Sequence, residues 1–326
     1  FSDLGEMMKA AENLYGTYRW DQYDLLVLPP SFPFGGMENP RLTFVTPTII
    51  AGDKSLVSLV AHELAHSWSG NLVTNETWND FWLNEGFTVY FENRIMEEVY
   101  GQDYANMLAV LGYSDLERTL KSLQKNNPED TKLKLDLEER NPDDGLTDIA
   151  YEKGALFLRN IEQLYGREAL DRFLNEYFQE HAFKTINTED FLSYLDSNLL
   201  SKNDSLKAIL KPNEWIYSSG LPDNHYKPGS VRLNQVKDDV ALFKDQRNSF
   251  DTNNTAKYTT HEWLYFLRSF DQDINDSLVH DLDQMFHFSS STNSEIISAW
   301  LSISLPSGYE PSVNLAQDFL NEVGRR

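Results

Sequence analysis

The stretch His62-Glu63-Leu64-Ala65-His66 is followed, after eighteen intervening residues, by Glu85. Apolar residues recur around it at helical spacing and predict a buried helix over residues 55–68. Histidines four apart on a helix project from one face, so His62 and His66 can reach a single Zn²⁺. Glu85, on a second predicted helix, supplies a third ligand, and Glu63 is placed beside the metal as a general base. The pattern therefore predicts metal-assisted hydrolysis.

Composition narrows the class of protein. The chain has 326 residues, of which 40% are hydrophobic, so two domains with sizeable cores are expected. The net charge of −23 argues against a nucleic acid or an anionic membrane as partner. The chain contains no cysteine, so zinc must be held by nitrogen and oxygen ligands alone. With no apolar run long enough to span a bilayer, we expect a cytoplasmic protein, and leave the periplasm and secretion open.

Local signals place the motif in a mostly helical first domain. Residues 2–15 read as a helix capped by Ser2 or Asp3, and residues 23–28 and about 42–45 read as strands. Residues 126–150 are rich in Pro, Asp and Asn and contain a strand-like stretch at 133–135. Further helices are predicted from apolar periodicity and flanking Gly, Asn and Asp at 83–100, 103–125, 152–165, 167–180 and 188–199.

A change of composition predicts a domain boundary. Ser218-Ser219-Gly220-Leu221-Pro222 and Lys227-Pro228-Gly229 are typical of a linker. We therefore expect a catalytic domain over residues 1–214, a linker over 215–230 and a helical domain over 231–326. Paired helices are predicted at 258–270, 275–287 and 292–302, and we expect this last domain to be incomplete.

Spacing alone leaves part of the chemistry open. A zinc with two histidines and one glutamate keeps a position for water and lowers the pKa of that water to about 7. Glu63 can accept the water proton and pass it to a leaving amine. The hydrogen-bond donor for the oxyanion can be any of the sixteen tyrosines. Read alone, Gly35-Gly36 is a turn or bulge and Glu38 a solvated acid. Glu92 shares the helix face of Glu85 and can support a metal ligand, and the alternative that we favour is a solvated acid.

Several motifs together resemble those of the gluzincin aminopeptidases. They are the zinc motif with Glu85, Gly35-Gly36-Met37-Glu38-Asn39 before it, Gly52-Asp53-Lys54-Ser55-Leu56, and Tyr151-Glu152-Lys153-Gly154. Tyr23-Asp24-Leu25-Leu26-Val27-Leu28-Pro29-Pro30 resembles the branch that includes leukotriene epoxide hydrolase. The likeness is dense over residues 1–222. It implies an α+β, thermolysin-like catalytic domain, mostly helical with a small sheet, followed by an all-α domain.

The resemblance also implies roles for individual residues. Glu38 would bind the free α-amine of a peptide, with Gly35, Gly36 and Met37 presenting backbone to it. Tyr151 would donate to the oxyanion. Arg325 matches the arginine that grips the peptide carboxylate, and a basic tail explains it equally well. One Zn²⁺ per chain and peptide substrates are implied.

Two departures from the family keep alternatives open. A β-rich N-terminal domain that contributes to the amine site in the family has no counterpart in this sequence. Leu146 stands where the epoxide-hydrolysing members carry a tyrosine, which argues against epoxide hydrolysis. The leading hypothesis is a zinc aminopeptidase acting on short peptides. The alternatives are a thermolysin-like endopeptidase and an inactive peptide-binding fragment.

Overall fold

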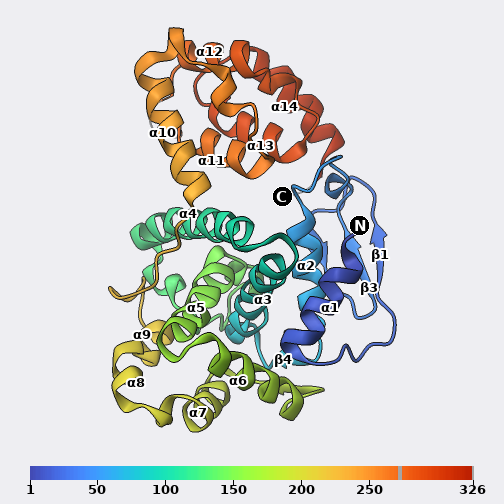
Figure 1. Cartoon of the computed structure of the whole chain (residues 1–326), viewed down its shortest axis with the longest axis vertical. Helices are drawn as coiled ribbons and strands as arrows, with labels where there is room; N and C mark the ends of the chain where they lie inside the picture. Colours follow the sequence, from blue (N-terminus) through green and yellow to red (C-terminus); the bar gives the residue numbers. More distant parts are fainter. Residues whose placement is uncertain (271–273, 325–326) are drawn as a thin grey trace.

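The computed structural model describes residues 1–270 and 274–324, which form a mostly helical protein with two small sheets (Figure 1). The strands are β1 (Asp24–Val27), β2 (Gly36–Met37), β3 (Leu42–Val45), β4 (Val73–Asn75) and β5 (Lys184–Ile186). The helices up to the predicted linker are α1 (Leu4–Tyr15), α2 (Val57–Ala65), α3 (Trp82–Tyr100), α4 (Gln102–Asn126), α5 (Gly154–Tyr165), α6 (Arg167–Glu180), α7 (Thr188–Asn198), α8 (Asp204–Leu210) and α9 (Pro212–Tyr217). Those after it are α10 (Val231–Gln246), α11 (Thr260–Arg268), α12 (Asp276–Phe286), α13 (Ser294–Ser304) and α14 (Pro311–Glu322).

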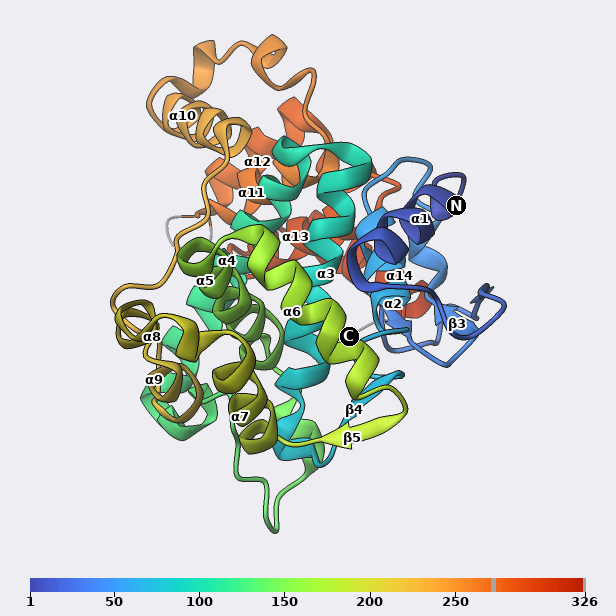
Figure 2. The ribbon, with the colours of Figure 1, turned by 60° about the horizontal axis from the view of Figure 1, so that its bottom comes forward.

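The two sheets are short and share no strand. In the first, β3 pairs in parallel with β1 and antiparallel with β2, so β2 is an edge strand. In the second, β4 and β5 pair in parallel although more than a hundred residues separate them (Figure 2). The second pairing brings α6 and α7 next to the start of α3. The predicted α+β class, with a small sheet in a mostly helical catalytic part, is confirmed.

Helix α3 forms the centre of the first hydrophobic core. Most of its residues are buried, polar ones included, as expected of a helix that other helices surround, and its Trp82, Phe87, Phe91 and Ile95 are fully buried. Helices α1, α2, α4 and α5 all pack against it. Because α3 is held on every side, the glutamate at its first turn has a fixed position.

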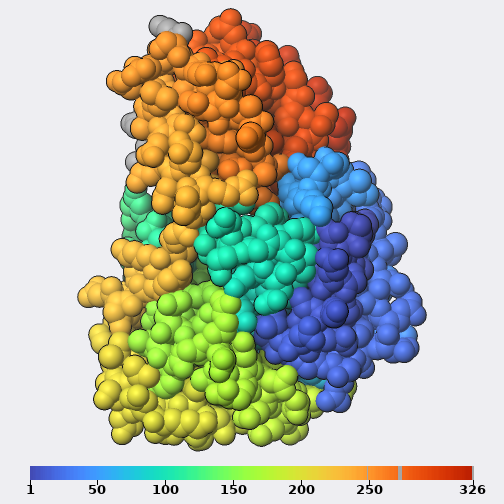
Figure 3. Space-filling model, viewed as in Figure 1, coloured from blue at the N-terminus to red at the C-terminus, as the bar shows by residue number. Residues whose placement is uncertain are grey.

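A second core belongs to helices α10–α14. Met107 and Leu111 of α4 join this cluster, so α4 belongs to both cores. Polar contacts add to the junction: Thr260 donates to Asp53 over 2.9 Å, and the Asn293 amide lies 3.3 Å from Ser55 Oγ. Figure 3 shows the orange and red helices resting on α4 and on the segment just before α2. The exact bounds proposed for the domains and linker stay a prediction.

Two local predictions are wrong for identifiable reasons. Residues 133–135 do not form a strand, because Leu133 and Lys134 both donate to the carbonyl of Ile216 and Leu135 donates to that of Asn79, which leaves no ladder. Asp3 precedes α1 but does not cap it with its side chain, which is bound to Lys54 and Tyr100 instead. Within the described ranges, no helix is long and apolar enough to cross a membrane.

Candidate metal centre

The two histidines and Glu85 meet where α2 crosses the first turn of α3. Glu85 Oε2 lies 3.3 Å from His62 Nε2 and 3.4 Å from His66 Nε2. The ligand atoms of the three residues all lie within 4.8 Å of one another. Glu85 Oε2 is buried and has no hydrogen-bond partner in the described part of the chain. Two nitrogens and one unsatisfied carboxylate oxygen converging on one point fit a zinc ion, which favours these ligands.

The outer nitrogen of each histidine ring is also held. His62 Nδ1 lies 3.1 Å from Glu92 Oε2, and His66 Nδ1 lies 2.9 Å from the carbonyl oxygen of Ser69. Since both partners accept hydrogen bonds, each Nδ1 carries a hydrogen, and Nε2 is the atom of each ring that can coordinate a metal ion. The interpretation of Glu92 as a solvated acid is therefore wrong. The sequence indicates only that Glu92 shares a helix face with Glu85, and its pairing with His62 depends on the angle between α2 and α3.

Charges at this centre favour a bound cation. Burial alone would raise the pKa of Glu85, but His66 and His62 outweigh it and lower the pKa to about 2. Burial would lower the pKa of His66, but the charges of Glu85 and Glu38 outweigh it and raise the pKa to about 9. A buried centre that keeps its carboxylate ionised and raises the basicity of its histidines attracts positive charge.

Glu63 lies on the next position of α2, directly beneath the backbone of β2. A Cβ atom at Gly36 would come within 2.2 Å of Glu63 Oε1, so only glycine permits this contact. Glu63 is 5% exposed and its Oε2 finds no partner among the described residues. Burial raises the pKa of Glu63 to about 7. An isolated buried carboxylate is costly, and a pKa near neutrality is suited to moving a proton.

The structure brings the predicted amine-binding segment to the same place. Glu38, Glu63 and His66 each offer an atom within 4.8 Å of the other two, so Glu38 adjoins His66 of the candidate metal centre. The carbonyl of Gly35 accepts from Thr46, and Met37 at the sheet edge is 38% exposed. Strand β2 thus presents an edge beside the centre, with an acid at its end.

Tyr151 reaches the centre from a π-helical turn, η5 (Ile149–Lys153), that leads into α5. Its ring stacks on His62 with centroids 6.2 Å apart. Burial raises the pKa of its hydroxyl, and the nearby carboxylates of Glu85 and Glu38 raise it further. The hydroxyl therefore stays protonated and can donate a hydrogen bond.

Two glycines allow this approach. A Cβ at Gly86 would lie 2.6 Å from Gly154 Cα, and one at Gly154 would lie 2.8 Å from Gly86 Cα. The backbones of α3 and α5 are thus in direct contact. Because Gly86 follows Glu85 and Gly154 closely follows Tyr151, the crossing brings the carboxylate and the hydroxyl together.

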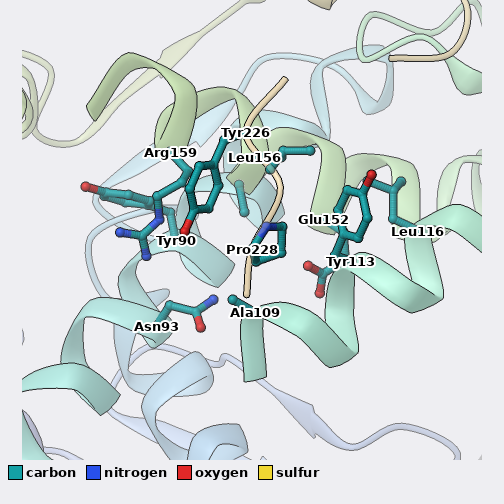
Figure 4. Close-up of a pocket in the computed structure, with 11 residues that line it drawn as sticks. Tyr90, Asn93, Ala109, Tyr113, Leu116, Glu152, Leu156, Arg159, Tyr226 and Pro228 are labelled. Atoms are coloured by element: carbon teal, nitrogen blue, oxygen red, sulfur yellow. The ribbon is translucent and has the colours of Figure 1, made fainter. Parts of the chain in front are cut away.

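The neighbours of Tyr151 in η5 face other directions. Glu152 points into a cavity of about 40 Å³ between α3, α4, α5 and the segment 226–228 (Figure 4). A Cβ at Gly112 would lie 2.3 Å from its carboxylate, and burial raises the pKa of Glu152 to about 8. The cavity is large enough to hold water. Tyr151 does not line it, so this pocket is separate from the metal centre.

Lys153 anchors the same turn. Its buried ammonium donates to the carbonyls of Thr131, over 2.7 Å, and Ser218, over 3.1 Å. Burial lowers the pKa of Lys153 to about 7. These contacts tie η5 to two segments distant in sequence.

Arg325, the predicted carboxylate-binding residue, lies outside the described residues. Gly324, the residue before it, donates its backbone N–H to the carbonyl of Pro30 over 2.7 Å.

Comparison with known families agrees with this geometry. Residues 2–215 match the peptidase family M1 domain. This chain belongs to peptidase family M1. Residues 258–326 match a second model, the C-terminal domain of leukotriene A4 hydrolase, which fits the helical second core. The predicted membership of the gluzincin aminopeptidase family is confirmed.

Relatives within this M1 branch cover the whole chain. It is 38% identical to leukotriene A-4 hydrolase of Xenopus laevis, over 100% of this chain and 54% of that protein. It is 35% identical to leucine aminopeptidase 2 of Yarrowia lipolytica, over 99% of this chain and 53% of the relative. The chain thus spans about half the length of these relatives.

Solved structures in the M1 family show the same arrangement of elements. Yeast leukotriene A4 hydrolase in complex with bestatin superposes with a TM-score of 0.89 at 30% identity, over 99% of this chain and 56% of that one. An M1 zinc metallopeptidase from Deinococcus radiodurans superposes with a TM-score of 0.54 at 25% identity, over 70% of this chain and 46% of the other. The thermolysin-like catalytic part and the helical C-terminal part are therefore those of M1 peptidases.

Proposed function

We propose that this chain carries the catalytic centre of a zinc-dependent aminopeptidase that hydrolyses the N-terminal peptide bond of short peptides. The observation that carries the proposal is that His66 belongs to two groups of neighbouring side chains. It belongs both to the group His62, His66 and Glu85 and to the group Glu38, Glu63 and His66. A metal position thus adjoins a pair of acids, one placed to move a proton and one at the end of an edge strand.

This arrangement suits a substrate with a free ammonium group. Glu38 supplies a fixed negative charge at a short distance from the metal ligands, and the edge of β2 can pair with an extended peptide. When Glu38 binds the ammonium group of a peptide, the first carbonyl of that peptide lies near His62 and His66. A longer N-terminal extension would place the ammonium group beyond Glu38.

Each residue has a distinct task in the reaction. Zinc, when bound, acts as a Lewis acid and lowers the pKa of water. Glu63 accepts the proton of the attacking water and delivers it to the leaving amine. The Tyr151 hydroxyl donates a hydrogen bond to the oxyanion that develops on the former carbonyl oxygen. Gly36 lets β2 cover Glu63, which keeps bulk water away from that carboxylate.

The experiment that tests the proposal compares a free-amine aminoacyl fluorogenic substrate with its N-acetylated twin, with and without a zinc chelator. Chelator-sensitive release from the free amine alone is the expected result. Release from both substrates would favour an endopeptidase. A folded, zinc-loaded chain that releases neither would contradict the proposal for this chain and favour the peptide-binding alternative.

Replacing Glu38 by Gln should weaken binding of the free amine. The carboxamide keeps the shape of the side chain but removes the charge that faces the ammonium group. We expect KM for the free-amine substrate to rise roughly 10- to 100-fold, the range for losing one partner of a charged hydrogen bond. Zinc content should stay at the wild-type level. Unchanged KM would remove Glu38 from substrate binding.

Replacing Tyr151 by Phe should lower kcat by roughly 10²–10³, as for loss of one oxyanion donor. The ring keeps its contact with His62, so KM and zinc content should change little. Tyr217→Phe is a matched control, because the Tyr217 hydroxyl bonds Glu189 on the surface. A kcat for Tyr151→Phe within twofold of wild type would exclude the hydroxyl from the reaction.

A further inference from the structure

The segment that follows α2 connects both parts of the proposed site. We call residues 67–71 the return turn. Within it the Ser69 carbonyl faces His66 Nδ1, and the backbone N–H of Asn71 donates to the carbonyl of His66 over 3.0 Å. Gly70 has a φ of +116°, and a Cβ there would lie 3.0 Å from His66 Nδ1. The turn therefore folds tightly back around one metal ligand.

The side chain of Asn71 leaves the turn and reaches the amine-binding segment. Its Nδ2 donates to the backbone carbonyl of Glu38 over 2.7 Å. The ladder between β2 and β3 pairs Gly36 with Val45 and Met37 with Phe44, so Glu38 lies one residue past its end. The hydrogen bond from the Asn71 amide therefore restrains Glu38 at a position beyond the end of the β2–β3 ladder.

Together the two hydrogen bonds form a short connection from His66, a proposed metal ligand, to Glu38, the residue proposed to bind the amine. The backbone of Asn71 is fixed to His66, and its side chain is fixed to Glu38. We propose that Asn71 is a positioning residue that sets the distance between the Glu38 carboxylate and the metal centre, and so selects the first peptide bond. The inference rests on the amine-binding role proposed for Glu38.

A purely structural role for Asn71 makes a different prediction. The backbone N–H of Asn71 already closes the return turn, and any residue except proline can supply it. If the side chain only stabilised the fold, its loss would lower the melting temperature and affect all ligands alike. If it positions Glu38, its loss affects ligands with a free amine and spares those without one.

The test is a binding measurement that does not require turnover. Leucinamide and N-acetyl-leucinamide are titrated into the zinc-loaded chain by calorimetry, for wild type, Asn71→Asp, Asn71→Ala and Glu38→Gln. Asp has the shape of Asn but presents an oxygen to the Glu38 carbonyl in place of the donor. Asn75→Ala is the matched control, because Asn75 Nδ2 donates to the nearby Thr77 carbonyl instead.

We expect Asn71→Asp and Asn71→Ala to weaken leucinamide binding roughly tenfold, the size of one lost hydrogen bond. Zinc content and melting temperature should match those of Asn75→Ala, and KM for the free-amine fluorogenic substrate should rise more than kcat falls. Wild-type affinity in both Asn71 variants, together with weak binding by Glu38→Gln, would overturn this inference alone. Equal affinity of the wild-type chain for the two ligands, or wild-type affinity in Glu38→Gln, would overturn the amine-binding role as well.

Discussion

Glu63→Gln is expected to reduce turnover by roughly 10²–10⁴, the range attributed to a general acid–base group, while zinc stays bound. The amide has the size of the carboxylate and should fit beneath Gly36 without moving β2. It cannot accept the proton of the attacking water. Because His62, His66 and Glu85 remain, the metal site should be intact.

The measurement is kcat for the free-amine substrate together with zinc content by mass spectrometry. Glu98→Gln is the matched control, because Glu98 is an exposed acid on α3. It should keep wild-type kcat and zinc content. If Glu63→Gln bound zinc and turned over at the wild-type rate, proton transfer by Glu63 would be wrong.

The metal motif could be predicted from sequence because its parts are local. His62, Glu63 and His66 share one helix, and helical spacing alone places the two rings on one face. Glu85 could be predicted as the third ligand because a helix is expected to begin near it. In contrast, Glu92 faces His62 only because α2 crosses α3 at a particular angle, and no local sequence pattern predicts that angle.

The surroundings of Tyr151 illustrate the same limit. Periodicity predicts a helix from residue 152, but the structure starts it with the π-helical turn η5, which directs Tyr151, Glu152 and Lys153 to three different environments. The contact between Gly86 and Gly154 depends on two helices that are far apart in sequence. Only the family resemblance singled out Tyr151 among the tyrosines of the chain.

His62→Ala should abolish stoichiometric zinc binding and, with it, activity. The variant removes one of the two nitrogen ligands that we propose for zinc and takes away the imidazole that faces Glu92. Zinc content after dialysis and affinity in chelator competition report this loss directly, whether or not the chain turns over substrate. His280→Ala is the control, since His280 is an exposed histidine on α12.

A graded variant makes this test sharper. Glu92→Gln keeps all three ligands but weakens the hydrogen bond that orients His62, so zinc affinity should fall about 10- to 100-fold. The expected order of zinc affinity is therefore wild type and His280→Ala first, then Glu92→Gln, then His62→Ala. If His62→Ala retained one tightly bound zinc, the ion would not be held by His62, His66 and Glu85. If Glu92→Gln matched wild type, the contact between Glu92 and His62 would not contribute to metal binding.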